Sequence, residues 1–523
     1  MKQVILEWQN YKLFPYEKDF ANIEIEHMFG LKPKNGSDKI RLPLKSFVSE
    51  DARRLTYFSK IVYPDGTIDI PYQAMLESSA KKGKTVKQVT RYSAHGLHEY
   101  KGKFNPQIVR SIGNILGLRP GASILDPFCG SGTTLLESAH IGWNSVGVDI
   151  NPHAVRIANA KIRALQIADG PLNSYAKNII CSLQDKIEVF SGTHDINEDV
   201  LNNELGMEWI NRLPSQDYLQ SWFTTPVLSQ ILIIKEAITE HIAETKDRDI
   251  FLVALSDLLR DVSLQEPADL RIRRRKNTLA NYPLLKIYSK KLPERIDLVC
   301  KARKQLGVLA NSNLAILGDI RSINSNSFSN FPVDKFDAVI TSPPYETALP
   351  YIDTQRLSLV LLGDIDSKEI NSTEKELIGA REITKIERLA IEEVIRKGDQ
   401  NLPQTVLKLC RDLLDAASLP GNGFRRVNRP ALTYRYFKKM YEFFLNIKNV
   451  LHQDAKVALV VGTNQTKLGG IPFHIDTPRL LTDIAVQCGY SFVEEYQMNT
   501  YQRYDLHQQN SINNEMLIIF SAL

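Results

Sequence analysis

Apolar and polar residues alternate along the chain with a period that changes from block to block. Residues 1–90 carry short alternating segments between turn signals such as KPKNGSDK and YPDGT, which indicates an α+β extension. Over residues 91–161 the apolar run SILDPF, a glycine-rich turn, the amphipathic GTTLLESAHIG and the apolar NSVGVDI follow one another. This order predicts a strand–helix–strand unit of a parallel sheet.

The strand–helix alternation is then interrupted twice. Residues 162–312 are mostly helical in pattern, as in SQILIIKEAITEHI, until NLAILGDI resumes the core. Residues 313–361 contain the strand DAVIT and a rigid turn, and a second polar, helix-rich block follows over 362–430. Residues 431–523 complete the core with the helix ALTYRYFKKMYEFFLNIKNVL, the strand VALVVGT, and two strands that could pair, YSFVEEYQM and EMLIIFSAL. The pattern therefore predicts an α/β core with two helical inserts.

Composition is that of an ordinary soluble protein. Of 523 residues, 43% are hydrophobic and 24% are charged, and no apolar run reaches eighteen residues, so we expect a cytoplasmic protein without a membrane span. The five cysteines fall in no CxxC pair, and the ten histidines form no HExxH motif. Neither a disulfide framework nor a metal site is expected.

The formal net charge of +5 identifies no partner, but two local clusters are strongly basic. A basic run is usually a solvated face, yet two such runs beside a nucleotide-type core favour contacts with phosphates. The candidate DNA contacts lie in DLRIRRRKN and GFRRVNRP and are Arg273, Arg274, Arg275, Arg425, Arg426 and Arg429.

The turn Asp126–Thr133, with sequence DPFCGSGT, connects a predicted strand to a predicted helix. Glycine there permits close approach of a ligand to the backbone, and a helix N-terminus offers free N–H groups to an anion. Asp149 ends the next strand, where a carboxylate suits a ribose diol. A phosphate-binding P-loop is excluded because no Gly-Lys-Ser/Thr follows, and NAD binding because GxGxxG is absent.

Four motifs in order resemble those of S-adenosylmethionine-dependent amino-methyltransferases: HEYKGKFNPQ at 98–107, DPFCGSGT with GVDINP, GDI at 318–320, and TSPPY at 341–345. The resemblance implies a Rossmann-like α/β methyltransferase sheet, mostly parallel and seven-stranded, with an antiparallel hairpin near the C-terminus. It implies that the cofactor contacts are Lys103, Phe104, Asn105, Asp126, Phe128, Gly130, Gly132, Thr133, Asp149, Ile150, Asp319 and Ile320. The catalytic residues that it implies are Ser342, Pro343, Pro344 and Tyr345.

SPPY also suits amine methylation on chemical grounds. The lone pair of an exocyclic base amine is delocalised into the ring, and acceptors held close to its hydrogens steer the lone pair toward the sulfonium methyl. Two prolines fix the turn, and Tyr345 can stack on a base extruded from the duplex. Methylation of cytosine carbon 5 would need a catalytic cysteine, but Cys129 lies in the cofactor loop, where we expect it to be a packing residue.

Serine in the first catalytic position (Ser342), with TSPPY complete, looks most like enzymes specific for cytosine N4. The expected activity is therefore methylation of that atom in duplex DNA, as the modification half of a restriction system. The motif order departs from that of many cytosine-N4 enzymes. Adenine-N6 methylation, RNA amino-methylation and a non-catalytic binding fold remain alternatives. A cognate endonuclease is the implied partner, and the inserts 162–312 and 362–430 are the candidate target-recognition regions.

Overall fold

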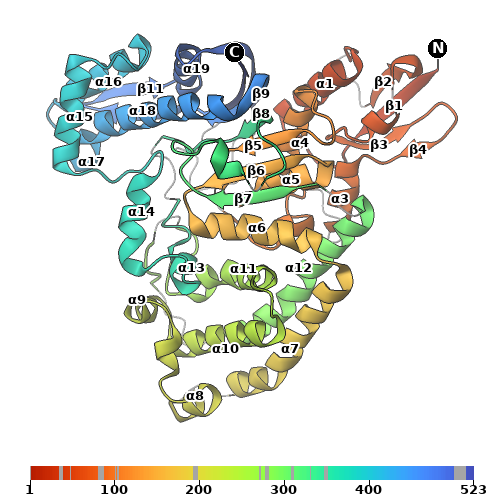
Figure 1. Cartoon of the computed structure of the whole chain (residues 1–523), viewed down its shortest axis with the longest axis vertical. Helices are drawn as coiled ribbons and strands as arrows, with labels where there is room; N and C mark the ends of the chain where they lie inside the picture. The colour runs from red at the N-terminus through yellow and green to blue at the C-terminus, as the bar shows by residue number, and fades with distance from the viewer. Residues whose placement is uncertain are drawn as a thin grey trace.

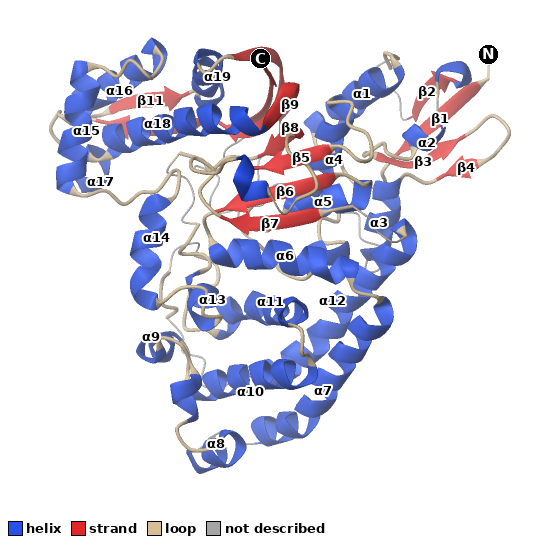
Figure 2. Ribbon diagram, viewed as in Figure 1, coloured by secondary structure: helices blue, strands red, loops and turns tan. Residues whose placement is uncertain are grey.

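A seven-stranded sheet forms the centre of the protein (Figures 1 and 2). The computed structural model describes residues 2–33, 39–47, 49–80, 87–100, 102, 105–192, 198–269, 272–276, 282–307, 311–329, 331–346, 351–499 and 514–523. In the order β12-β13-β9-β8-β5-β6-β7, the strands are Tyr490–Asn499, Asn514–Ala522, Leu451–Gly462, Phe336–Thr341, Ser123–Asp126, Asn144–Asp149 and Asn313–Leu317.

The central strands β9, β8, β5, β6 and β7 are parallel, whereas β13 is antiparallel to both β9 and β12. The two apolar runs at the end of the chain therefore form the expected hairpin. This sheet confirms the Rossmann-like methyltransferase fold that the motifs implied.

Helices cover both faces of the sheet, because successive side chains of a strand point to opposite faces. Ile124 of β5 packs in the cluster of α4 (Pro106–Ile115), on the face toward the N-terminal extension. Its neighbour Leu125 packs on the other face, in the cluster of α18 (Arg429–Ile447) and α19 (Thr477–Gln487). Burying one such side chain contributes about 1.5–3 kcal/mol, so the two faces together stabilise the sheet.

The unit predicted over 91–161 continues from β5 into α5 (Thr133–Ile141), β6 and α6 (Pro152–Gln166). Asn151 caps α6, because its side chain accepts hydrogen bonds from the N–H groups of the second and third helical residues. Pro152 occupies the first helical position, where its missing N–H costs nothing. This cap ends β6 sharply and leaves Asp149 at the edge of the sheet.

The N-terminal extension has its own antiparallel sheet in the order β2-β1-β3-β4. These strands are Lys39–Pro43, Gln3–Trp8, Phe58–Val62 and Ile68–Asp69, and the helices are α1 (Pro15–Phe29), α2 (Ser49–Ala52) and α3 (Tyr72–Ala80). The extension packs against the core through α1, which contacts α4 and β12, and the ring centroids of Phe20 and Tyr496 are 6.2 Å apart. Sheet core and extension share one apolar cluster.

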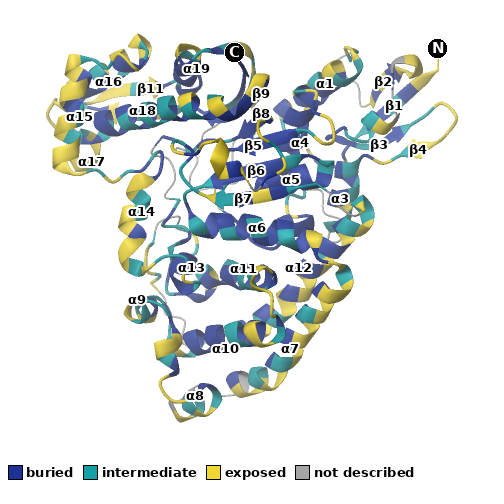
Figure 3. Cartoon of the chain, in the orientation of Figure 1, coloured by how far each residue is buried: buried dark blue, intermediate teal, exposed yellow. Residues whose placement is uncertain are grey.

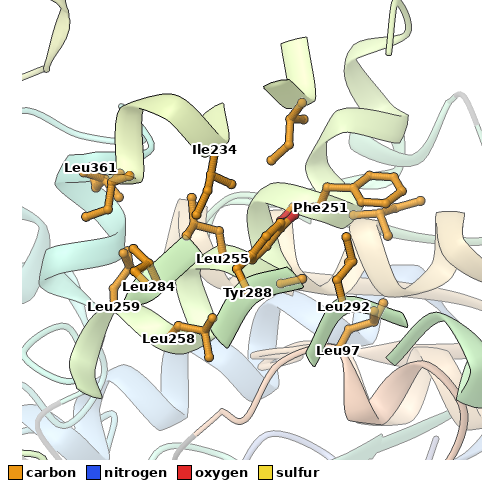
Figure 4. Packing of buried hydrophobic residues seen from close by; sticks show 14 of the residues in the cluster. Leu97, Ile234, Phe251, Leu255, Leu258, Leu259, Leu284, Tyr288, Leu292 and Leu361 are labelled. Carbon is orange, nitrogen blue, oxygen red and sulfur yellow. The ribbon is translucent and has the colours of Figure 1, made fainter. Parts of the chain in front are cut away.

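A helical lobe follows α6, which extends to Gln166 (Figure 1). Its helices are α7 (Asp169–Gly192), α8 (Glu198–Leu205), α9 (Gln216–Trp222), α10 (Thr225–His241), α11 (Thr245–Val262) and α12 (Leu284–Leu306). Figure 4 shows their shared core, into which Leu97 and Leu361 also reach. Leu361 ends α13 (Arg356–Leu361), so this lobe is packed against both segments that flank the site described below.

The second insert contains α14 (Ile370–Glu376), α15 (Lys385–Lys397), α16 (Gln404–Ala417) and the single turn α17 (Phe424–Val427). Helices α15 and α16 pack on α18, and the hairpin of β10 (Asn464–Leu468) and β11 (Ile471–Ile475) contacts α16. No helix in the described part of the chain is long and apolar enough to cross a bilayer.

Candidate active site

A cavity of about 780 Å³ lies at the carboxyl ends of the parallel strands, where open α/β sheets bind ligands. Neither Gly132 nor Pro343 is among its lining residues, and Lys103 and Phe104 lie outside the described residues. The residues singled out in the sequence that line it are Asn105, Asp126, Phe128, Gly130, Thr133, Asp149, Ile150, Asp319, Ile320, Ser342, Pro344 and Tyr345.

A direct hydrogen bond joins the glycine-rich turn to the strand that leads into SPPY. Strands β5 and β8 are parallel neighbours, so both end at the same edge of the sheet. The hydroxyl of Thr341 donates to the Asp126 carboxylate over 2.6 Å, and the N–H of Phe128 donates to the same oxygen over 3.2 Å. Asp126 therefore fixes the two loops relative to each other, and burial raises the pKa of its carboxyl to about 6.

Asp149 is held by the backbone on both sides. The N–H of Gly130 donates to one carboxylate oxygen and the N–H of Asn151 to the other, both over 2.8 Å. Each oxygen keeps a further lone pair, so the carboxylate still accepts hydrogen bonds from a diol in the cavity. Burial raises the pKa of Asp149 to about 6 despite these N–H donors.

Cofactor affinity is expected to fall as the pH is lowered through about 6, because a protonated Asp149 accepts hydrogen bonds less well. The sign follows from the raised pKa, since ionisation is complete only above it. Asp149→Asn should weaken binding at pH 8 by about 1–3 kcal/mol and reduce its pH dependence. Calorimetric titration with S-adenosylmethionine from pH 5 to 8 measures both effects, and an affinity for the unaltered chain that does not change over this range would contradict the assignment.

The start of α5 suits a carboxylate group. Gly132 at the N-cap provides no side-chain hydrogen bond to the first N–H groups of the helix, which remain available to an anion. The Ser131 hydroxyl is buried in the cavity wall without a partner among the described residues. These features, with the acceptor Asp149, fit the amino-acid end and the ribose of S-adenosylmethionine.

Gly130 and Gly132 differ in what they do. A Cβ on Gly130 would lie 3.3 Å from the Tyr100 ring, but at Gly132 (φ +76°) it would lie 2.7 Å from the Cβ of Ala158. Gly132 is therefore required for packing of α5 against α6. Gly130 is the position at which the backbone reaches the cavity.

Asp319 follows β7 and is paired with Arg321, whose Nε lies 3.0 Å from both carboxylate oxygens. Burial alone would raise the pKa of Asp319, but the bonds from Arg321 outweigh it, and the pKa lies below its usual value. The carboxylate is thus ionised and fixed at the cavity wall beside Ile320. A fixed acceptor beside an apolar side chain suits an aminopurine ring.

Tyr345, the last residue of SPPY, is held by a distant strand. Its hydroxyl donates to the Glu515 carboxylate of β13 over 2.6 Å, and its N–H donates to the Tyr351 hydroxyl over 3.3 Å. Ser342, Tyr351 and Glu515 line the same cavity. The SPPY turn therefore faces the cavity with a neutral hydroxyl, an aromatic ring and a nearby carboxylate.

A buried network fixes the segment before α4. Glu137 of α5 accepts hydrogen bonds from Tyr92 over 3.0 Å and from His95 over 2.8 Å, and it forms an ion pair with Arg110. Burial alone would raise the pKa of Glu137, but Arg110 and His140 outweigh it, and the pKa lies well below its usual value. The ionised carboxylate therefore anchors residues 92–100 on α5 and positions Tyr100 in the cavity wall.

Part of the cavity wall had no signal in the sequence. Residues 1–90 carry no motif for catalysis or cofactor binding, yet Phe14, Tyr16 and Gln88 line the cavity. Gln88 accepts a hydrogen bond from Asn105 over 2.9 Å. The second insert contributes the wall residues Glu376, Leu377 and Ile378. Tyr100 was within reach of sequence reasoning, because it lies in the motif HEYKGKFNPQ.

The two arginine clusters are not uniformly exposed. In the first, Arg275 donates to the backbone carbonyls of Asp261 and Gln265, and Arg274 lies over the Trp222 ring. Arg273 and Arg274 are exposed, and Arg273 pairs with Asp269 over 3.6 Å. These contacts secure the turn after α11, so all three members of this cluster have partners within the chain.

In the second cluster, Arg425 and Arg426 are exposed, but Arg429 is not. The Arg429 guanidinium donates over 2.8 Å to Glu346, whose side chain is fully buried directly after SPPY. Prediction of Arg429 as a solvent-facing phosphate contact therefore conflicts with its position, because its charge is used by a buried carboxylate.

Comparison with known proteins finds similar sequences among methyltransferases. Residues 35–160 match the family described as "DNA methylase" of the N6/N4 methyltransferases. The Type II methyltransferase M.MjaII of Methanocaldococcus jannaschii is 22% identical over 70% of this chain and 71% of its own length. M.BsoBI of Geobacillus stearothermophilus is 27% identical over 53% of this chain, and the aligned part is 54% of that protein.

A third relative has a different name. The tRNA (guanine(10)-N2)-dimethyltransferase of Methanothermobacter thermautotrophicus is 36% identical over 70 residues, which are 13% of this chain and 21% of that enzyme. The chain thus shares only a short segment with it. The sheet, the cavity and these matches support an amino-methyltransferase of the N4/N6 kind, with S-adenosylmethionine as the methyl donor.

Proposed function

We propose that this chain transfers a methyl group from S-adenosylmethionine to the exocyclic N4 of cytosine within a specific duplex DNA sequence. The observation that carries the proposal is that Asp126, Gly130, Ser342 and Tyr345 all line the same cavity. Methyl transfer needs donor and acceptor in near contact, and a shared cavity permits that.

In this proposal the chain's own residues bind and orient both reactants. Asp149, Asp319 and the first turn of α5 hold the cofactor, which supplies the electrophilic methyl group. Ser342 and the carbonyl of the following proline accept hydrogens of the amine and direct its lone pair toward that methyl. Tyr345 stacks on the extruded base.

Two observations support an amine as the acceptor rather than carbon 5. Ser342 provides an uncharged acceptor, which suffices for the amino group of cytosine. The thiol of Cys129 is buried, and burial raises its pKa well above the usual value. A thiol that stays protonated is a poor nucleophile for attack on the ring.

DNA as the substrate is supported by the extent of the matches. The two Type II methyltransferases align with 70% and 53% of the chain, whereas the tRNA enzyme aligns with 13%. In the same proposal the chain is the modification enzyme of a restriction system, and a cognate endonuclease acts at the same sequence. Arg273, Arg425 and Arg426 contribute phosphate contacts from their exposed positions.

The product decides between the candidate bases. Plasmid DNA from a host without methylases is incubated with the chain and S-adenosylmethionine, and its nucleosides are analysed by mass spectrometry beside total RNA treated in the same way. We expect N4-methylcytosine in the duplex DNA. If N6-methyladenine were the sole product, DNA would remain the substrate but the assignment of cytosine as the target base would be wrong. If methyl groups were found only in RNA, the assignments of DNA and of cytosine would both be wrong.

A further inference from the structure

An aromatic side chain stands in solvent beside the helix that supports the SPPY loop. Phe424 is 79% exposed, and Gly423, Arg425 and Arg426 next to it are exposed as well. Figure 3 shows this turn, α17, at the surface. A phenylalanine that leaves its ring in water forfeits the gain of burial, so a partner for this ring is expected.

Hydrogen bonds and an ion pair fix the backbone on both sides of Phe424. On its N-terminal side, Asn422 donates to the carbonyls of Ala416 and Leu419 and accepts a hydrogen bond from the Gly469 N–H over 2.8 Å. On its C-terminal side, α18 begins at Arg429, which is paired with buried Glu346. The ring therefore has a defined position relative to the SPPY turn.

That position is close to the catalytic segment. Phe424 begins α17 and Arg429 begins α18, with only four residues between them. The Arg429 guanidinium contacts the residue after Tyr345. In Figure 1, α17 lies beyond the carboxyl edge of the sheet, and residues at the same edge line the cavity. The helical turn that carries the exposed ring is thus on the same side of the sheet as the cavity.

The charges beside the ring indicate the partner. Arg425 and Arg426 are exposed, and no carboxylate of the described residues lies within ion-pair distance of either. An apolar ring next to two exposed cations matches a base stack bounded by phosphates. It does not match an apolar protein surface, which would offer nothing to the two charges.

We propose that Phe424 inserts into the base stack of duplex DNA and fills the space that the target base leaves when it enters the cavity, while Arg425 and Arg426 contact the flanking phosphates. The proposal rests on the DNA activity proposed above. It adds the residue that stabilises the DNA while the target base is extruded from the duplex. Its role is needed only where a base must leave an intact pair.

The test uses two duplexes that carry the target sequence read from methylated plasmid. In one the target base is paired, and in the other it faces an abasic site, so there is no pair to break. Rates of tritiated methyl transfer are measured for the full chain, for Phe424→Ala, for Phe424→Trp and for the control Ile386→Ala, which truncates another exposed apolar residue (82%) on α15. Calorimetry with S-adenosylmethionine confirms that each variant keeps the cofactor site.

We expect Phe424→Ala to lose at least about tenfold in rate on the paired duplex and to stay within about threefold of the full chain on the abasic duplex. Phe424→Trp and Ile386→Ala should remain within about threefold on both, because tryptophan also stacks and Ile386 lies on a different helix, α15. An unchanged rate of Phe424→Ala on the paired duplex, or an equal loss on both duplexes, would overturn the inference alone. Absence of any methylated DNA would overturn the DNA activity and this inference with it.

Discussion

Arg429→Met is expected to lower the methyl-transfer rate at least about 100-fold, although Arg429 does not line the cavity. Its loss leaves the fully buried Glu346 without its cation, and breaking a buried pair in this way costs about 3–5 kcal/mol. Glu346 is also bonded to the Thr433 hydroxyl over 2.5 Å, and its carbonyl to Asn464 over 2.7 Å. These bonds hold the chain directly after Tyr345, so the SPPY turn is expected to lose its position.

Whether Arg429 positions the SPPY turn or only stabilises the fold is tested by comparing its ion pair with another ion pair of similar burial. Arg388 pairs with Glu392 on α15 over 2.9 Å, with side chains 17% and 8% exposed. Arg388→Met should lower the melting temperature without changing kcat, whereas Arg429→Met should reduce kcat with cofactor affinity retained. Arg429→Lys keeps a cation and should recover part of the rate. Equal kcat for the two methionine variants would contradict a positioning role for Arg429.

Tyr345→Ala is expected to abolish most activity, with a loss of at least about 100-fold in kcat/KM for DNA and no change in cofactor affinity. Stacking on a base contributes about 1–3 kcal/mol, and misplacement of the amine adds to that loss. Tyr345→Phe keeps the ring but loses the hydrogen bond to Glu515, so a reduction of about tenfold or less is expected.

The Glu515→Gln variant tests the origin of that smaller effect. An amide oxygen still accepts the Tyr345 hydroxyl hydrogen, so this variant should resemble the full chain more closely than Tyr345→Phe does. Steady-state kinetics on methylatable plasmid, with parallel calorimetry for S-adenosylmethionine, measures all three variants. Full activity of Tyr345→Ala would exclude stacking by this residue.

The sheet and its order of elements could be predicted to a large extent because local signals agree with the global fold. The apolar run before Asp126, the glycine turn and the amphipathic helix after it are all encoded within about twenty residues, and the parallel pairing follows from that connection. The last two segments could likewise be identified as strands that could pair, and they pair as β12 and β13. The SPPY motif directly follows a predicted strand, and that position was enough to predict that it lies beside the cofactor turn.

The surroundings of the charged side chains, in contrast, could not be predicted from the sequence. GFRRVNRP reads as one basic run, but Arg425 and Arg426 face solvent while Arg429 turns into a buried pair with Glu346. In RIRRRKN, two arginines bond backbone carbonyls or cover a tryptophan ring. A run of like charges carries no information on which side chain meets a carboxylate, because that depends on elements far away in the chain.

By itself the sequence determined the strand–turn–helix core, the cofactor turn and the position of SPPY at a strand end, since hydrophobic period and turn chemistry are local properties. Only the tertiary structure decided that Glu515 bonds Tyr345 across 170 positions, that Phe14 and Tyr16 of the extension line the cavity, and that Arg429 supports the catalytic turn. Such contacts form where separate elements pack together, and no local pattern specifies which side chains then meet.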